Sequence, residues 1–312
     1  MLLYIITMLQ KTIKNSIKFS GVGLHTGRAV NGRIVPAAED TGITFVRTDI
    51  PGRPELKAEA SNVLTTSYAT SLGTKEFSIS TVEHLLAAFY GLGVDNAVVE
   101  INGPEVPILD GSSAEFIDMI ESAGLSELCS PRKYIVIRRP IKVQENGKYV
   151  FVMPAEEMEF TVDYTIDFSH PFVTRQNFSR RFSKEVFKNE VGRARTFGFL
   201  HDVETLRKNG LARGGSLDNA IVIGEGEILN EGGLRYPDEF VRHKVLDMMG
   251  DISLLGAPLV CRIIAHRSGH SLNYKLIQQV LKMRGRWEMV DAWSMRGVAK
   301  AELPALDKVA TL

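Results

Sequence analysis

Two histidine-bearing segments lie far apart in the sequence and repeat one spacing. His84 precedes Gly91 by seven residues, and His243 precedes Gly250 by seven residues. Each segment has the periodicity of a helix, and each is followed by a strand-like stretch, a loop and a second helical stretch. Such an echo indicates a duplicated unit with one histidine-bearing helix in each half. We therefore expect an α+β fold with sheets packed against pairs of helices.

The second segment places two potential metal ligands on one helical face. His243 and Asp247 are spaced i, i+4, while Val245 and Met248 fall roughly opposite them. Two histidines and one aspartate could hold a zinc ion and leave a fourth position open for water, as catalytic sites require. An isolated His-x-x-x-Asp pair is nevertheless more often a surface pair on a helix. The pair predicts a metal site only if His84 joins it from the other half.

Side chains near these ligands could supply acid and base chemistry. Glu83 and, in a Ser-Gly-His loop, His270 are candidates for proton transfer. Asp251, one turn after Asp247, could hydrogen-bond a histidine and favour its charged form. The alternative for Glu83 is structural, because Ser80 and Glu83 match a capping box. The alternative for Asp251 is a solvated charge on the helix surface.

The composition gives the chain no bulk charge. Its 312 residues are enough for two domains, and 37 Lys and Arg residues balance 37 Asp and Glu residues. This balance gives no sign of a nucleic-acid-binding protein. The two cysteines, Cys129 and Cys261, belong to no Cys-x-x-Cys motif, which favours a reducing cytoplasm.

The apolar start of the chain, residues 1–9, is short of the roughly 20 residues that span a bilayer. It lacks preceding basic residues and a following small-residue cleavage site, so a signal peptide is not expected. It is interpreted as an extra segment or as the sign of a true start at Met8. No other window resembles a transmembrane helix. A lipid substrate would then be reached from the surface, by a cytoplasmic protein that could lie at the periphery of the inner membrane.

Periodicity and turn signals define the expected elements of the first half. A helix over 81–90 would be capped by Ser80 or Thr81 and ended by Gly91, and a strand over 94–101 would follow. Ser112 and Glu115 match a capping box for a second helix.

Residues 125–132 are the best candidate for a domain boundary. They would separate a domain at 8–127 from a domain at 132–285, and 286–312 would form a tail. The second half would contain strands at about 134–139, 141–145, 149–153 and 159–166, a glycine-rich interruption at 196–219, then helix 238–253, strand 259–265 and helix 271–283.

Three further segments are indecisive alone. The segment 192–198 (GRARTFG) has the composition of a basic turn, and 214–220 (GGSLDNA) lacks the Lys-Ser/Thr of a P-loop. The segment 21–27 (GVGLHTG) matches a dinucleotide-binding motif only in part. His25 and Thr26 could still form a functional loop.

Taken together and in order, these motifs resemble those of the UDP-3-O-acyl-N-acetylglucosamine deacetylase family, zinc enzymes of bacterial lipid A biosynthesis. The resemblance runs from about residue 12 to residue 283. It is carried by the segments 21–27, 80–84, 93–96, 104–112 (PEVPILDGS), 193–198 (RARTFG), 214–220, 240–251 and 268–273 (SGHSLN). Each segment is weakly specific alone, whereas their joint order is highly specific.

The resemblance implies two similar α+β domains, each with a small insert, and an active site in the cleft between them. It implies that zinc, or ferrous iron in its place, is held by His84, His243 and Asp247. The implied activity removes the N-acetyl group from UDP-3-O-acyl-N-acetylglucosamine. The products would be acetate and UDP-3-O-acyl-glucosamine, in the committed step of lipid A biosynthesis.

The resemblance also implies roles for further residues. Glu83 would be the general base, and His270 would be the general acid, supported by Asp251. Thr196 would help to stabilise the oxyanion. The residues that would contact the sugar nucleotide are Lys244, Phe197, Lys148 and Arg267. An insert at about 198–222 would line an apolar passage for the acyl chain, with Leu200, Val203, Ala212 and Val222.

The match has departures, and two alternatives stay open. Arg267 stands where lysine is common in the family, segment 67–71 lacks a cysteine often found there, and the chain after Gly285 matches poorly. A binding module whose metal only ties the two halves together would need a closed four-ligand site. A related zinc hydrolase would act on another acylated sugar.

Overall fold

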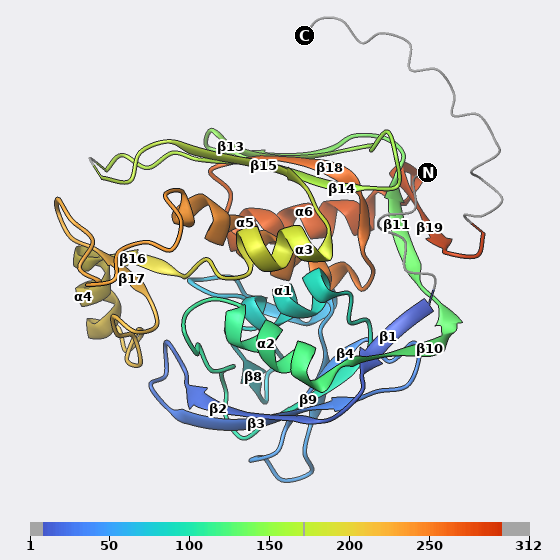
Figure 1. Ribbon diagram of the computed structural model, residues 1–312, viewed down its shortest axis with the longest axis horizontal. Coiled ribbons are helices and arrows are strands. Elements are labelled where there is room, and N and C mark those ends of the chain that lie inside the picture. The colour runs from blue at the N-terminus through green and yellow to red at the C-terminus, as the bar shows by residue number, and fades with distance from the viewer. Residues whose placement is uncertain (1–8, 171, 295–312) are drawn as a thin grey trace, which may run out of the picture.

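The chain folds as an α+β structure in which helices lie between two main β-sheets (Figure 1). The computed structural model describes residues 9–170 and 172–294. The proposed start at Met8 and the end of the expected tail lie outside these residues. Within the described ranges, no helix combines the length and the apolar character needed to cross a membrane.

The sheet of the first half has five strands in the spatial order β2-β3-β9-β4-β5. In β2, Ile17 and Phe19 are buried while Lys18 and Ser20 are exposed, as in a sheet with one face on the core. Helices α1 and α2 lie above that face (Figure 1). The bounds are β2 (Ile17–Val22), β3 (Ala29–Pro36), β4 (Ile43–Arg47), β5 (Glu55–Lys57), β9 (Ala97–Ile101), α1 (Glu83–Leu92) and α2 (Ala114–Ala123).

The second half builds a similar sheet, in which neighbouring strands follow the order β12-β13-β18-β14-β15. Strands β11 (Lys133–Ile137) and β19 (Trp287–Asp291) extend it, because β11 pairs with both β18 and β19. Residues 287–291, expected in the tail, are therefore a strand. The other bounds are β12 (Ile141–Glu145), β13 (Lys148–Met153), β14 (Phe160–Ile166), β15 (Gln176–Arg181), β18 (Leu259–His266), α5 (Glu239–Ile252) and α6 (His270–Lys282).

The two sheets share one topology. Strand β9 is antiparallel to β3 and parallel to β4, and β18 is likewise antiparallel to β13 and parallel to β14. In each half a histidine-bearing helix, α1 or α5, precedes the central strand, and α2 or α6 follows it. Strand order thus supports the repeat expected from the sequence. The division into separate domains at 8–127 and 132–285 stays a prediction.

Helices α1 and α5 pack against each other at the centre of the molecule, and glycines allow the close approach. A Cβ atom on Gly250 would lie 2.1 Å from the carbonyl oxygen of Glu83. Only glycine lets the two backbones come this close. At the matching place in α1, a Cβ atom on Gly91 would lie 2.1 Å from the Phe187 ring. Most buried apolar side chains of both halves form one continuous core, and a small separate cluster contains Tyr134, Val136, Val260 and Ala292.

The start of α1 differs from the sequence prediction. The helix begins at Glu83, and neither Ser80 nor Thr81 caps it with a side chain. The Glu83 carboxylate instead accepts a hydrogen bond from the backbone N–H of Thr70 at 3.0 Å. A long-range contact has therefore replaced the capping box suggested by local spacing.

Two other helix ends were also misjudged. Helix α1 continues through Gly91 to Leu92 and is capped by Gly93, whose left-handed φ of 76° is typical of a helix terminator. The capping box of Ser112 and Glu115 does not form either. Helix α2 begins at Ala114, whose backbone N–H donates to the Ser112 hydroxyl at 3.0 Å.

Smaller elements surround the two sheets. Residues 125–132, expected as a domain boundary, contain strand β10 (Leu125–Pro131), which is antiparallel to β1 (Leu9–Ile13). Strands β6 (Val63–Thr65), β7 (Ser71–Gly73) and β8 (Ser78–Ile79) form a small sheet. Helix α3 (Lys184–Val186) runs into a π-turn (Phe187–Val191). The expected insert holds β16 (Phe197–Phe199), α4 (Leu200–Lys208) and β17 (Ile221–Ile223), which lie at one end of the molecule (Figure 1).

Candidate metal centre

Three potential metal ligands meet where α1 and α5 pack together. His84 lies in the first turn of α1, and His243 and Asp247 lie on one face of α5. One ligand atom from each residue lies within 4.8 Å of the others, and all three side chains are buried. Asp247 Oδ1 is 3.2 Å from His243 Nε2 and 3.6 Å from His84 Nε2. The fold thus brings together the three residues singled out in the sequence.

The donor atoms at this point fit a bound cation. Asp247 Oδ1 is buried and accepts no hydrogen bond from the described residues. His243 Nδ1 lies 3.0 Å from the Ala194 carbonyl oxygen, which only accepts, so Nδ1 carries the proton and Nε2 presents a lone pair. Burial lowers the pKa of His243 and so favours the neutral ring. Converging lone pairs in a buried place repel one another unless a cation lies between them.

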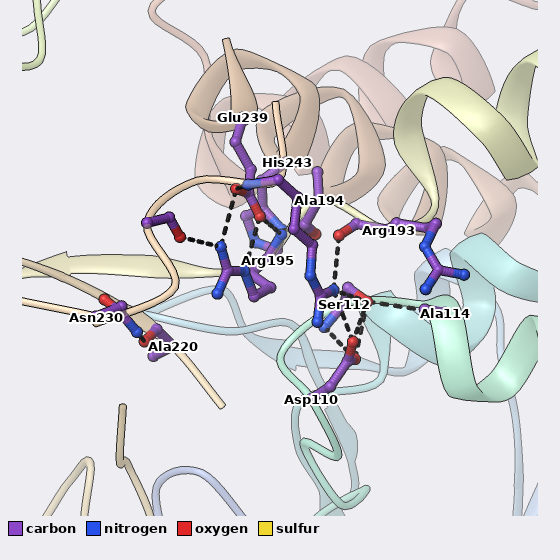
Figure 2. Close-up of polar contacts among 12 residues, drawn as sticks. Asp110, Ser112, Ala114, Arg193, Ala194, Arg195, Ala220, Asn230, Glu239 and His243 are labelled. Atoms are coloured by element: carbon purple, nitrogen blue, oxygen red, sulfur yellow. Dashed lines mark hydrogen bonds and ion pairs between the residues drawn. The ribbon is translucent and has the colours of Figure 1, made fainter. Parts of the chain in front are cut away.

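The carbonyl group of Ala194 is held by a buried ion pair beside it (Figure 2). Arg195 Nε and Nη2 lie 2.9 Å and 3.1 Å from the two carboxylate oxygens of Glu239. The backbone N–H of Arg195 donates to the same carboxylate at 3.0 Å, and its guanidinium also donates to the Gly233 carbonyl. The ion pair therefore fixes the loop that orients His243.

Glu239 is a residue that reasoning from the sequence missed. It lies one turn before His243, so Glu239, His243, Asp247 and Asp251 follow one another at four-residue intervals along α5. All four are at most 2% exposed. Residues four apart share a helix face. A run of four such polar residues was the signal that could have revealed Glu239.

A second set of contacts joins the 104–112 motif to the same loop. Arg235 Nη1 donates to Asp110 Oδ2 at 2.7 Å and to the Arg193 carbonyl oxygen at 2.9 Å. The backbone N–H of Thr196 donates to the Gly111 carbonyl oxygen at 2.7 Å. Motifs from the two halves are therefore neighbours at the ligand group.

Glu83 and His270 lie next to the ligand group. His270 Nε2 is 3.8 Å from Glu83 Oε1 and 3.9 Å from Asp247 Oδ2. The other ring nitrogen, Nδ1, is 2.9 Å from Asp251 Oδ2. Asp251 Oδ1 also accepts a hydrogen bond from the Thr70 hydroxyl at 2.5 Å. Asp251 thus orients the imidazole so that Nε2 faces the cluster.

Burial and neighbouring charges raise the pKa values of Glu83 and His270. Burial raises the pKa of Glu83 to about 7, against the opposing charge of His270. Burial alone would lower the pKa of His270, but the carboxylates of Asp251 and Asp247 outweigh it and raise that pKa to about 10. A carboxyl group able to accept a proton near neutral pH therefore lies beside an imidazolium able to donate one.

Two expected substrate contacts, Phe197 and Lys244, lie at the edge of the cluster, next to Thr196, the residue expected to stabilise the oxyanion. The Phe197 ring centroid is 6.2 Å from that of His243, and Lys244 Nζ is 5.5 Å from the Phe197 centroid. Lys244 Nζ is also 2.7 Å from Asp247 Oδ2, whereas His84 and His243 lie nearest Oδ1. Thr196 directly precedes Phe197, at the entry to β16.

Lys148 and Arg267 lie together at one end of the second sheet. Strand β13 begins at Lys148, and its next residue, Tyr149, pairs with His266 at the end of β18. Arg267 directly follows His266, where β18 ends and the backbone turns away with a φ of 52°, and both the Lys148 and Arg267 side chains are exposed. Two cations thus border the loop that leads into His270.

The insert begins directly after Phe197. Strands β16 and β17 are parallel, and α4 connects them. Of the residues expected to line an acyl passage, Leu200 is 43% exposed, Ala212 is buried, and Val203 and Val222 are half-buried.

A cavity of about 230 Å³ lies elsewhere, and its lining includes none of the ligand or acid–base residues. Polar side chains along its wall pair with one another. Arg132 Nε donates to Asp95 Oδ1 at 2.7 Å, and Asn96 Nδ2 donates to Gln10 Oε1 at 2.9 Å. We therefore do not assign the chemistry to this cavity.

Comparison with known proteins agrees with the motifs. The model of the family described as LpxC: UDP-3-O-acyl N-acetylglycosamine deacetylase matches residues 10–282. The chain belongs to this family. Members of the UDP-3-O-acyl N-acetylglycosamine deacetylase family are metalloenzymes, and the ligand group described above is a possible metal site in this member.

Curated relatives with the name UDP-3-O-acyl-N-acetylglucosamine deacetylase resemble the chain over most of its length. The protein of Saccharophagus degradans is 48% identical over 283 residues, which are 90% of this chain and 93% of the relative. The protein of Myxococcus xanthus is 47% identical over 283 residues, 91% and 90% of the two chains. The protein of Acidithiobacillus ferrooxidans is 46% identical over 284 residues, 90% and 93% of the two chains.

Proposed function

We propose that this chain is a metal-dependent hydrolase that removes the N-acetyl group from UDP-3-O-acyl-N-acetylglucosamine. The products are acetate and UDP-3-O-acyl-glucosamine, and the reaction is the committed step of lipid A biosynthesis. The observation that carries the proposal is the three-ligand group with Glu83 and His270 beside it. The substrate comes from the name of the relatives.

His84, His243 and Asp247 would hold one ion, and zinc suits this ligand set best, with ferrous iron as the alternative. The bound ion supplies Lewis-acid polarisation of the acetamide carbonyl and of the attacking water. Only three ligands converge among the described residues, which favours a catalytic site over a closed structural one.

Glu83 and His270 divide the two proton transfers. Glu83 takes a proton from water as its oxygen attacks the acetamide carbon. Protonated His270 gives a proton from Nε2 to the amide nitrogen as the C–N bond breaks, since an amide anion would be a very poor leaving group. Asp251 keeps His270 charged and oriented. The Thr196 side chain helps to stabilise the negative charge on the carbonyl oxygen.

The sugar nucleotide is held by cations and an aromatic ring around the cluster. Lys148 and Arg267 face the nucleotide's phosphates, while Lys244 and Phe197 contact the sugar. The acyl chain runs from the sugar into the insert, along Leu200, Val203, Ala212 and Val222. The support for the acyl path is its position, because the insert begins directly after Phe197, which lies beside His243.

Acetate release tests the proposed function. Metal-replete protein is expected to release acetate from UDP-3-O-acyl-N-acetylglucosamine far faster than from N-acetylglucosamine or UDP-N-acetylglucosamine, because those sugars lack the acyl chain. Equal rates on all three sugars, or no acetate from the acylated one, would contradict the assignment. Faster release from a different acylated N-acetyl sugar would point to a related hydrolase.

The pH profile tests the role of Asp251. His270 must be protonated to act as the acid, so activity falls as pH rises through the pKa of His270. Removing the Asp251 charge in Asp251→Asn lowers that pKa, so we expect the alkaline limb of kcat/KM to move down by roughly 1–3 pH units. Asp118→Asn, on the exposed face of α2, is the matched control. An unmoved limb in Asp251→Asn would remove Asp251 from this role.

We also propose that the protein works in the cytoplasm and touches the membrane through its insert. Leu200 and Leu217 are 43% and 47% exposed, and such apolar side chains can enter a lipid surface. Co-sedimentation with phospholipid vesicles should weaken in a Leu200→Glu, Leu217→Glu variant. The control is Met289→Glu, an exposed apolar position on β19. Equal binding by all three proteins would contradict membrane contact through the insert.

A further inference from the structure

A fully buried carboxylate joins the loop at 23–27 to the start of α1. Glu105 is 0% exposed. Its Oε1 accepts hydrogen bonds from the His25 backbone N–H at 2.8 Å and from the Thr81 hydroxyl at 2.9 Å. Its Oε2 accepts from the Thr26 backbone N–H at 2.8 Å. Three donors from two separate segments thus meet on one side chain.

On one side, Glu105 contacts a residue close to the chemistry. Thr81 precedes Glu83 by two residues and His84 by three. It is buried and has a φ of 56°, a left-handed conformation that is rare and unfavourable for a β-branched residue. Such a conformation persists only where surrounding contacts hold it. The hydroxyl bond to Glu105 is one such contact.

On the other side, the loop is paired with the insert. The backbone N–H of Gly214 donates to the Leu24 carbonyl oxygen at 3.0 Å, and that of Arg213 donates to the His25 carbonyl oxygen at 3.2 Å. The packing leaves no room for a side chain at Gly214, where a Cβ atom would lie 2.2 Å from the Gly23 carbonyl oxygen. The two glycine-rich motifs that sequence alone left unassigned are therefore in direct contact.

These contacts form one continuous path from the insert to the catalytic helix. It runs from Arg213 and Gly214 through the 23–27 loop and Glu105 to Thr81, at the start of α1. We propose that Glu105 is a positioning residue that couples occupation of the insert by the acyl chain to the placement of Glu83. The acyl chain would then raise kcat as well as tighten binding. This inference rests on the proposed function of the insert.

Glu105→Gln changes the hydrogen bonds of this residue while keeping the size of its side chain. An ionised carboxylate only accepts hydrogen bonds, whereas a glutamine amide group turns one acceptor oxygen into a donor. One of the backbone N–H groups of His25 and Thr26 then faces a donor instead of an acceptor. The hold of the 23–27 loop on Glu105 is weakened at one bond, while no catalytic group is altered.

The experiment compares kcat for two substrates in two enzymes. The substrates are UDP-3-O-acyl-N-acetylglucosamine with a long acyl chain and the same sugar with a 3-O-acetyl group. In the unaltered enzyme we expect the long chain to raise kcat at least about tenfold. In Glu105→Gln we expect this ratio to fall toward one, with kcat on the short substrate within about threefold of the unaltered enzyme. Glu127→Gln, at an exposed position, is the matched control.

The outcomes separate coupling from a merely structural role. Equal loss of kcat on both substrates, or an unchanged ratio, would overturn the coupling. So would an unaltered enzyme whose kcat does not depend on chain length while its KM does. An enzyme that deacetylates neither substrate would instead refute the proposed function. If Glu105→Gln does not fold, Thr81→Ala removes the same link, and Thr81→Ser restores the hydroxyl and should restore the ratio.

Discussion

Glu83→Gln is expected to lower kcat by a factor of about 10²–10⁴, the usual contribution of a general base. The amide keeps the shape of the side chain and its hydrogen bond from Thr70 but cannot take a proton at neutral pH. Metal content should stay at the unaltered level, because Glu83 is not one of the three ligands. Acetate release and elemental analysis on the same preparation measure both quantities.

The proposed general acid, His270, can be tested in the same way. His270→Gln should also lower kcat strongly, and the double variant should lose less than the product of the two single losses, since both groups serve one reaction. Glu76→Gln, an exposed carboxyl, is the control and should keep normal turnover. Near-normal deacetylation by the double variant would rule out this pair as the base and acid.

Loss of a metal ligand should have an equally large effect by another route. His243→Ala is expected to abolish tight metal binding and to lower kcat by about a thousandfold or more, because a catalytic ion supplies several kcal/mol of transition-state stabilisation. Asp247→Ala should do the same, and it also leaves the Lys244 ammonium without its carboxylate partner. Metal titration monitored by calorimetry measures the first effect, and acetate release measures the second.

The matched control for these variants is His201→Ala. His201 is on α4 with a side chain that is 77% exposed, so its loss should change neither metal binding nor turnover. Adding metal back to chelator-treated unaltered protein should restore activity, whereas the ligand variants should not respond. Full activity in metal-free His243→Ala protein would exclude a metal-assisted reaction at this site.

Local patterns were sufficient for the ligand-bearing helix and for many of the strands, but not for the helix ends or for β10 and β19. His243 and Asp247 are four residues apart, and helix geometry puts residues at that spacing on one face, here a face of α5. The echo around His84 also anticipated the second copy, which the shared strand order supports. In the first case the information lies within one helical turn, and in the second it lies in a spacing repeated in both halves.

Contacts between distant segments account for most of what the sequence did not predict. Glu83 matched a capping box, but Thr70 N–H takes up its carboxylate, and the Thr70 hydroxyl in turn reaches Asp251 from the other half. Glu239, which the sequence did not single out, is paired with Arg195 from a distant loop. A single sequence carries no record of such pairings.

Metal titration into metal-depleted protein, followed by acetate release from UDP-3-O-acyl-N-acetylglucosamine, tests the central claim most directly. We expect the rate to rise linearly with added zinc or ferrous iron and to level off at one ion per chain, because His84, His243 and Asp247 form a single ligand group in the described part of the chain. Full acetate release before any metal is added, or no release at any metal concentration, would contradict the account.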